Sequence, residues 1–347
     1  MMKISARWSA FLLTGLLTVN AFAQASSLLQ YDKPDRESKL LEAAKLDETL
    51  TLYTAFRPQD LPLIIAPFEA KYGIKVKAWR SGSNNVTQRV VREAASRRPE
   101  VDLIMMPASE MAYVWKEKIL QSVSSPYFKD LIPNAVPAHR AWSNVFMNVT
   151  VHSYNTNLLK KTDLPKTYED LLAPKWKGKL GVEAKAEEWF TKVVTTMGED
   201  KGVRLFKNIA QQNGMSARIG ASLLQNLVIA GEVPLALTVY IDLPEKDKRA
   251  GKPVDWFAME PVVAQGFAMG LAQRAQHPNA AMLFYDYMLS PETQKLLASL
   301  HYYPTSSKVT NPYPSLKIDV VDPVATIEGY AKWNKLFEDT VTKNAAK

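Results

Sequence analysis

The chain has 347 residues, of which 47% are hydrophobic and 22% charged, and its formal net charge is +8. This length suits two domains of ordinary size, and the composition excludes a disordered or fibrous chain. Cysteine is absent from the sequence. Disulfide bonds, thiolate metal sites, cysteine nucleophiles and a lipid-modified N-terminal cysteine are therefore excluded.

The first residues have the pattern of a secretory signal peptide. Lys3 and Arg7 precede an apolar run at residues 10–19, and the small-residue pattern Ala-Phe-Ala follows at residues 21–23. The run has about half of the ~20 residues that a bilayer crossing needs. We expect residues 1–23 to be cleaved, which lowers the net charge from +8 to +6 (8 − 2). The alternative is an amphipathic or buried N-terminal helix. An exported, unanchored chain indicates the bacterial periplasm.

Regular patterning begins after a polar N-terminal extension at residues 24–47, which contains a short helical pattern at residues 38–45. Apolar residues then follow strand and helix periods in alternation. The predicted strands are residues 49–54, 74–79 and 101–106, and the predicted helices are residues 60–71, 86–96 and 109–117. This order predicts a mostly parallel sheet covered by helices.

The second half begins with a long β-branched segment at residues 142–154, which we interpret as a strand running between two lobes. Thr167 and Asp170 have the spacing of a helix start. The other predicted elements are strands at residues 179–183, 233–240 and 254–260, and helices at residues 187–196, 201–212, 223–230, 279–289, 292–300 and 326–340. We expect lobe 1 at 48–150, lobe 2 at 151–255, and a return to lobe 1 with C-terminal helices at 256–347.

Motifs for enzymatic chemistry are missing. The sequence has no dinucleotide fingerprint, phosphate-binding P-loop, HExxH zinc motif or calcium loop. Its four histidines have no ligand spacing: His139, His152, His277 and His301. One alternative is a secreted serine hydrolase that uses Ser222 or Ser83 with a histidine, although residues 220–224 lack the final glycine of a nucleophile elbow. We expect no enzymatic activity and no cofactor.

Positive charge concentrates on one predicted helix, which carries Arg89, Arg92, Arg97 and Arg98 on it or just after it. Such a run can contact nucleic acid, but it is also typical of a solvated helix face. Because export separates the chain from nucleic acid, we expect no nucleic-acid partner.

Three loops have the composition of ligand-binding loops. Thr54 and Arg57 follow the first strand, and ligands of open α/β sheets bind at the carboxyl ends of strands. An arginine there can hold an anion through two hydrogen bonds. The second loop, residues 80–85, follows the second predicted strand, and the third places Ser222 before a helix. In each case the alternative is a surface arginine or a helix-capping loop.

Several stretches of the chain together resemble a known family. They are residues 50–55, 68–76, 153–157, 168–179, 230–236, 278–281 and 289–294. Over about residues 49–307 the chain resembles the periplasmic solute-binding proteins of ABC importers, in the ferric-iron-binding branch of extracellular family 1. The resemblance implies an α/β fold of the two-lobed periplasmic binding protein type (type II), in which each lobe is a mixed sheet covered by helices. It also implies a strand hinge, a solute held in the cleft between the lobes, and docking on an inner-membrane ABC permease.

One departure from the family bears on the solute. Ferric binders of this family usually present adjacent tyrosines after the strand that follows the Gly-Glu turn, whereas this chain has Tyr240 alone there. The chain does have adjacent tyrosines at residues 302–303, but these follow a late helix where the family has no metal ligands. Arg57 would repel a bare cation. We therefore favour an anionic solute: a phosphonate, a phosphorylated compound, a carboxylate or an iron chelate. The alternative is ferric iron with Tyr240 and a carboxylate as ligands and a small anion beside Arg57.

The predicted solute contacts come from both lobes. Tyr154 is a hinge-side candidate, and Glu183 and Glu187 lie on a segment expected to face the cleft. The remaining predicted contacts are Thr54, Arg57, Ser81, Ser83 and Asn84 in lobe 1, and Ser222 and Tyr240 in lobe 2. We expect a monomer whose partners are a small solute or ion and the permease, with a membrane sensor kinase as an alternative docking target.

Overall fold

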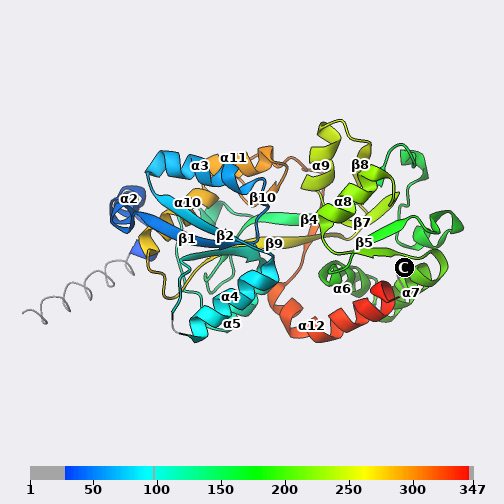
Figure 1. The fold of residues 1–347 in the computed structure, drawn as a ribbon, viewed down its shortest axis with the longest axis horizontal. Helices are drawn as coiled ribbons and strands as arrows, with labels where there is room; N and C mark the ends of the chain where they lie inside the picture. The colour runs from blue at the N-terminus through cyan, green and yellow to red at the C-terminus, as the bar shows by residue number, and fades with distance from the viewer. Residues whose placement is uncertain (1–27, 97, 344–347) are drawn as a thin grey trace, which may run out of the picture. The chain divides into compact units, whose positions relative to one another are not determined.

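The computed structural model describes residues 28–96 and 98–343, which form two compact units (Figure 1). Unit 1 contains the described residues up to Met106 together with residues 114–143 and 269–293. Unit 2 contains residues 107–113, 144–268 and the described residues from 294 on. The predicted signal peptide lies outside the described residues, and the predicted lobe boundaries stay a prediction.

Unit 1 contains a parallel three-stranded arrangement with β1 (Thr49–Thr54) at its centre. β2 (Lys75–Arg80) pairs with one edge of β1, and β3 (Leu103–Pro107) pairs with the other. The crossovers are α3 (Leu61–Tyr72) and α4 (Ser83–Ala95). The predicted β-α-β-α-β order of this region is therefore confirmed.

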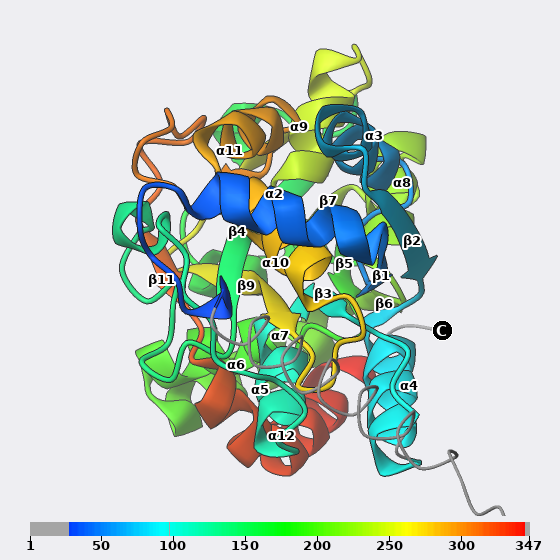
Figure 2. The same cartoon turned by 90° about the vertical axis from the view of Figure 1, so that its left-hand side faces the viewer.

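A pair of helices far apart in the sequence completes unit 1. α2 (Arg36–Asp47) packs along α10 (Pro278–Leu289), and Figure 2 shows the two side by side. Their contact includes a buried ion pair in which Arg36 Nε lies 2.6 Å from Asp286 Oδ2. The predicted helical pattern at residues 38–45 is thus part of a longer helix that belongs to the unit 1 core.

The sheet of unit 2 is mixed. β7 (Leu235–Tyr240) lies between β4 (Ser143–Asn155), which is antiparallel to it, and β5 (Leu180–Glu183), which is parallel. β6 (Ser216–Arg218) pairs in parallel with β5, and β8 (Val254–Phe257) pairs antiparallel with β4. The carboxyl ends of β5, β6 and β7 consequently meet at one edge.

Helices cover both faces of this sheet (Figure 1). On one side lie α8 (Ala221–Ala230) and α9 (Asp242–Arg249), which contact β7. On the other lie α6 (Glu187–Met197), α7 (Glu199–Asn213) and α12 (Pro323–Phe337), with α6 in contact with both α7 and α12. An apolar cluster lies between the sheet and α6, α7 and α12.

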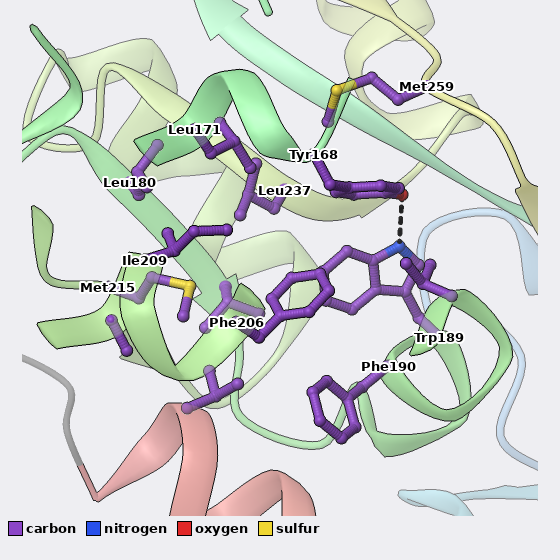
Figure 3. Packing of buried hydrophobic residues seen from close by; sticks show 14 of the residues in the cluster. Tyr168, Leu171, Leu180, Trp189, Phe190, Phe206, Ile209, Met215, Leu237 and Met259 are labelled. Atoms are coloured by element: carbon purple, nitrogen blue, oxygen red, sulfur yellow. Dashed lines mark hydrogen bonds between the residues drawn. The ribbon is translucent and has the colours of Figure 1, made fainter. Parts of the chain in front are cut away.

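Several aromatic rings pack against one another in that cluster (Figure 3). Phe206 of α7 lies 5.4 Å from the Trp189 ring and 5.5 Å from the Phe190 ring, measured between centroids. Trp189 Nε1 donates a 3.3 Å hydrogen bond to the hydroxyl of Tyr168. The buried indole N–H is therefore satisfied while its ring fills the core.

The remaining elements are short or are shared between the units. α5 (Ala108–Lys116) and β9 (Val262–Leu271) each begin in unit 2 and end in unit 1. The others are α11 (Pro291–Ser299), β10 (Tyr303–Pro304), β11 (Ile318–Val320), the 3₁₀ helices Phe128–Asp130, Lys161–Asp163, Glu169–Leu172 and Pro174–Trp176, and the π-helix Glu338–Thr342. No described helix has the length and apolar character of a membrane span.

The sequence analysis did not predict β6, α9 or β9, and one predicted helix start differs from the structure. The strand β9 was not predicted, because Gln265, Gly266 and Gly270 interrupt its apolar run. The helix start predicted at Thr167 is followed only by the 3₁₀ helix Glu169–Leu172, which has no side-chain cap. Asp170 still accepts a hydrogen bond from the Thr167 N–H, as a capping acid does, and a second one from the Lys166 N–H. The side chain of Asp170 thus closes the turn formed by residues 166–170.

Candidate functional site

In unit 1 the first two predicted loops meet at the carboxyl ends of β1 and β2. Ser81 donates its backbone N–H to the carbonyl of Thr54 at 3.1 Å, and Arg80 Nε donates to the carbonyl of Phe56 at 2.9 Å. Thr54 is fully buried, and its hydroxyl oxygen accepts a hydrogen bond from the Phe56 N–H. The Thr54 hydroxyl group therefore fixes the start of the first loop, whereas the Ser81 N–H connects the second loop to the first.

The other predicted residues of unit 1 surround this junction. Arg57 is half-buried, and its carbonyl accepts hydrogen bonds from Asp60 and Leu61 at the start of α3. Ser83 and Asn84 occupy the first turn of α4, where Asn84 is exposed. Parallel pairing of β1 with β2 thus brings all five predicted residues of unit 1 to one edge of its sheet.

In unit 2 the corresponding edge is organised by Glu183, the last residue of β5. Its carboxylate accepts hydrogen bonds from the backbone N–H groups of Gly220 (2.9 Å) and Lys185 (2.6 Å). Its own N–H donates to Thr238 Oγ1 on β7 at 2.6 Å. Burial raises the pKa of Glu183, and the two backbone donors oppose that shift. Glu183 therefore ties the ends of neighbouring strands together and positions the loop that leads to α8.

Glu187 is the first residue of α6, close to Glu183. Its Oε2 atom is buried and has no hydrogen-bond partner among the residues that the structure describes. Burial raises the pKa of Glu187 to about 7, and the neighbouring acids Glu183 and Glu110 push in the same direction. A large share of Glu187 is therefore uncharged at neutral pH, although it lies at a helix N-terminus.

The remaining predicted residues of unit 2 are divided between two edges of the sheet. Ser222, in the first turn of α8, is exposed, and Tyr240 ends β7 at the same edge as Glu183. Tyr154 pairs in register with Leu235 at the start of β7, and its side chain belongs to the apolar core. The structure therefore does not place Tyr154 with the other predicted contacts of unit 2.

The histidines have structural partners. His152 is buried, its Nδ1 lies 2.8 Å from the carbonyl oxygen of Leu237, and burial lowers its pKa to about 4. His277 Nδ1 lies 2.9 Å from Asp102 Oδ2, and the His139 ring stacks on Trp115. Within residues 28–96 and 98–343, no group of three or more His, Cys, Asp or Glu side chains is arranged to hold a metal ion.

Two acids near this edge of unit 2 were not predicted. Asp242 is buried in the first turn of α9, two residues after Tyr240. Glu188 follows Glu187 on α6 and contacts Ser109. An acid in the first helical turn directly after a predicted strand is the signal that points to Asp242, whereas no local pattern distinguishes Glu188 from an ordinary first-turn acid.

The family follows from comparison with known sequences. Residues 64–321 match the family described as bacterial extracellular solute-binding protein. The chain belongs to the bacterial extracellular solute-binding proteins. The family resemblance predicted from the sequence motifs is thus confirmed.

Two similar sequences are named for iron. This solute-binding protein is 25% identical over 194 residues to the "Fe(3+)-binding periplasmic protein" of Serratia marcescens, covering 55% of this chain and 57% of that protein. It is 23% identical over 306 residues to "Iron uptake protein A1" of Synechocystis sp., covering 82% of this chain and 83% of that protein. The match to the first of these relatives spans little more than half of its length.

Solved structures share the fold. Iron-bound HitA from Pseudomonas aeruginosa has a TM-score of 0.72 and 21% identity, covering 84% of this chain and 99% of that one. AfuA from Actinobacillus pleuropneumoniae with bound fructose-6-phosphate has a TM-score of 0.72 and 19% identity, covering 85% and 98%. The predicted α/β fold of periplasmic binding proteins is therefore confirmed.

Proposed function

We propose that this solute-binding protein is the periplasmic receptor of an ABC importer, which captures a small solute and passes it to the permease chemically unchanged. Membership of the family and the fold shared with other periplasmic binding proteins support this function. We further propose export with removal of residues 1–23, which intact mass measurement of the periplasmic protein tests. A mass that retains these residues would contradict it.

The proposed solute is anionic, because the two joined loops of unit 1 bring together groups that bind anions. Arg57 lies on the first loop, the second loop adds the neutral hydroxyl and amide groups of Ser81, Ser83 and Asn84, and β1 and β2 end at the same edge. Such groups hold phosphate and carboxylate oxygens. Burial raises the pKa of Glu187 to about 7. A large share of this carboxyl group is therefore uncharged at neutral pH, and the uncharged form does not repel an anion.

A ligand screen tests the solute class directly. Native mass spectrometry of the purified protein identifies any molecule that remains bound. Thermal shift then compares inorganic phosphate, fructose 6-phosphate, an alkylphosphonate, citrate, ferric citrate and a ferric salt. A solute at about 100 times its dissociation constant adds roughly 2.7 kcal/mol to the free energy of unfolding. Stabilisation by none of the anions would contradict the proposal.

Arg57→Ala tests the role of the first loop. We expect at least a tenfold loss of affinity for the stabilising anion, because a charge-assisted hydrogen bond contributes roughly 1.5–3 kcal/mol. The control is Arg92→Ala on α4, which removes one positive charge outside the predicted contacts. Equal losses in both variants would assign the effect to net charge and contradict a direct contact.

Ferric iron is the second candidate solute, favoured by the names of the two similar sequences and by Tyr240 at the end of β7. A phenolate oxygen suits a hard trivalent cation. The test is a phenolate-to-iron charge-transfer band on adding a ferric salt, which Tyr240→Phe removes. A ferric salt that binds with no such band would exclude Tyr240 as a ligand.

The proposed partner is an ABC permease, and we propose that the receptor is a monomer. Purified receptor is expected to stimulate ATP hydrolysis by its cognate transporter in proteoliposomes, with a single-chain mass in solution. Activation of a membrane sensor kinase without any stimulation of the transporter would favour the alternative docking target.

A further inference from the structure

A second arginine lies at the junction of the two loops of unit 1, and it is not among the predicted solute contacts. Arg80 is the last residue of β2 and pairs in register with Thr54, the last residue of β1. Its Nε donates a 2.9 Å hydrogen bond to the carbonyl of Phe56, which directly precedes Arg57. The guanidinium group of Arg80 therefore lies against the first loop, although the residue itself leads into the second loop.

The carbonyl group that holds Arg80 is itself fixed in place. Phe56 is buried, and its N–H donates to Thr54 Oγ1 at 3.0 Å. The Ser81 N–H donates to the Thr54 carbonyl at 3.1 Å, and the Ser81 hydroxyl oxygen accepts a 3.0 Å hydrogen bond from Asn85 Nδ2. These contacts restrict both loops, so the guanidinium group is positioned before a solute arrives. Binding then costs less conformational entropy than ordering a free side chain would.

The charge of Arg80 is not offset by an acid. Arg36, Arg89 and Arg249 each pair with a carboxylate at 2.6–2.8 Å. Arg80 is exposed, and among the residues that the structure describes it has no carboxylate partner. A backbone carbonyl accepts a hydrogen bond but carries no net charge. The contact with Phe56 therefore orients the guanidinium group and leaves its positive charge available to a ligand.

The donors that Arg80 retains suit an anion. A guanidinium group has five N–H bonds, and Phe56 occupies the one on Nε. The four N–H bonds on the two terminal nitrogens have no partner within residues 28–96 and 98–343. Two parallel N–H bonds of this kind bind two oxygens of one phosphate or carboxylate group.

The acid nearest along the first loop lies beside Arg57. Asp60, the N-cap residue of α3, is buried, and its N–H donates to the Arg57 carbonyl at 3.2 Å. The second loop, residues 80–85, contains no acid, and neither does the first turn of α4 that follows. Arg80 thus adds positive charge on the side of the junction where neither loop supplies a negative one.

We propose that Arg80 is a direct solute contact and that it makes the site select multiply charged anions over singly charged ones. The inference rests on the proposed anionic solute and deepens it, because it names the charge of the group that is bound. The Coulomb attraction between a cation and a ligand is proportional to the charge of the ligand. A phosphate monoester, a phosphonate or a polycarboxylate therefore gains more from a second arginine than a singly charged anion does.

The first test compares fructose 6-phosphate with fructose 6-sulfate by titration calorimetry at neutral pH. The two esters share the sugar, but the phosphate carries about −1.5 to −2 charges and the sulfate carries one. We expect Arg80→Ala to weaken binding of the phosphate about tenfold and of the sulfate about threefold, since the lost attraction scales with ligand charge. A merely looser loop would weaken both by the same factor, so equal losses would overturn the direct contact.

Lys77→Ala is the matched control. Lys77 is an exposed cation of the same strand, but it pairs in register with Thr51, and an odd spacing of three residues places its side chain on the other face of β2 from Arg80. We expect this variant to lose less than about twofold in affinity for either ester. Losses equal to those of Arg80→Ala would assign the effect to net charge and overturn the proposal.

The outcomes separate this inference from the proposed function. Stabilisation of the wild type by none of the anions in the ligand screen would remove both. Stabilisation by a singly charged anion, with no binding of fructose 6-phosphate or citrate, would overturn the role of Arg80 and leave an anionic solute standing.

The second test observes the contact itself and does not depend on a variant's affinity. In protein labelled with nitrogen-15 arginine, the side-chain N–H signals of Arg80 are identified by their loss in Arg80→Lys. We expect saturating fructose 6-phosphate or citrate to shift these signals and to leave those of Arg92 on α4 unchanged. Arg80 signals that stay in place at saturation would overturn the proposal.

Discussion

Unit 1 and unit 2 both bury carboxyl groups, but they compensate the charge differently. In unit 1, Asp286 pairs with Arg36, and Asp102 accepts hydrogen bonds from the backbone N–H groups of Thr51, Gln276 and His277. In unit 2, Glu187 and Glu188 lie near further acids, and Lys185 is the neighbouring cation that acts on Glu187. Arg36 opposes the rise that burial causes in the pKa of Asp286, whereas the acids near Glu187 and Glu188 add to the rise that burial causes in their pKa values.

The comparison shows that burial alone does not decide how a carboxyl group affects stability. A buried charge needs a partner, and an acid without one retains its proton instead. Removing the cation partner of a buried acid in unit 1 should therefore lower the free energy of unfolding. Removing a titrating acid of unit 2 should raise it in alkaline solution. Three substitutions examine that contrast, and the largest effect is expected in unit 1.

Arg36→Met removes the cation of the buried pair in unit 1. We expect the free energy of unfolding to fall by about 3–5 kcal/mol at pH 7, because Asp286 is then buried without a compensating charge. Urea denaturation measures this loss. Burial raises the pKa of Asp286 and Arg36 opposes that shift, so the loss should shrink at low pH, where Asp286 takes up a proton.

Lys39→Met is the matched control, since it removes a cation of the same helix whose partner, Asp35, is solvent-exposed. An exposed pair contributes little to stability. A loss in Arg36→Met no larger than in Lys39→Met would contradict the assignment of the buried pair.

Glu183→Ala removes the acceptor that joins the strand ends of unit 2. We expect a loss of about 1–3 kcal/mol, because the N–H groups of Gly220 and Lys185 lose their partner. The measurement is urea denaturation together with hydrogen exchange at the Gly220 amide. Glu183→Gln retains one acceptor oxygen and should lose less. An unchanged exchange rate at Gly220 in the alanine variant would contradict the positioning role.

Glu187→Gln should have the smallest effect, and it is a gain. Burial raises the pKa of Glu187 from its ordinary value of 4.5 to about 7 in the folded protein. The stabilisation from its proton is complete below pH 4.5 and is lost as pH rises through 7. At pH 8 the glutamine variant should therefore exceed the wild type by on the order of 1 kcal/mol in unfolding free energy, with no gain at pH 4. Equal stability at pH 8 would mean that Glu187 ionises without cost.

Much of unit 1 could be predicted from local patterns. The alternation at residues 49–54 and the helix that ends at Gly73 identify β1 and α3, and the strand–helix order implies a parallel sheet. That topology alone predicts that Thr54 and Ser81 come together, as their hydrogen bond shows. Local periodicity suffices there because both loops follow adjacent parallel strands.

The strand β9 and the contacts of Ser109 with Glu188 and Gln265 could not be predicted in this way. Gln265, Gly266 and Gly270 interrupt the apolar run of β9, and Gly266 meets Asn144, whose Oδ1 would lie 2.2 Å from a Cβ at that glycine. Ser109 is 79 residues from Glu188 and 156 residues from Gln265 along the chain. No sequence period connects such residues, since only packing brings them together.

By itself the sequence determined the order of strands and helices, the family to which the chain belongs, and the loops that carry Thr54 and Ser81. The tertiary structure decided which buried acids lie beside a cation and which lie beside other acids, and it placed Tyr154 in the core rather than with Tyr240. The physical reason is the range of the interactions. Helix and strand periods depend on neighbouring residues, whereas the pKa of a carboxyl group depends on the water that distant segments exclude and on the charges they bring.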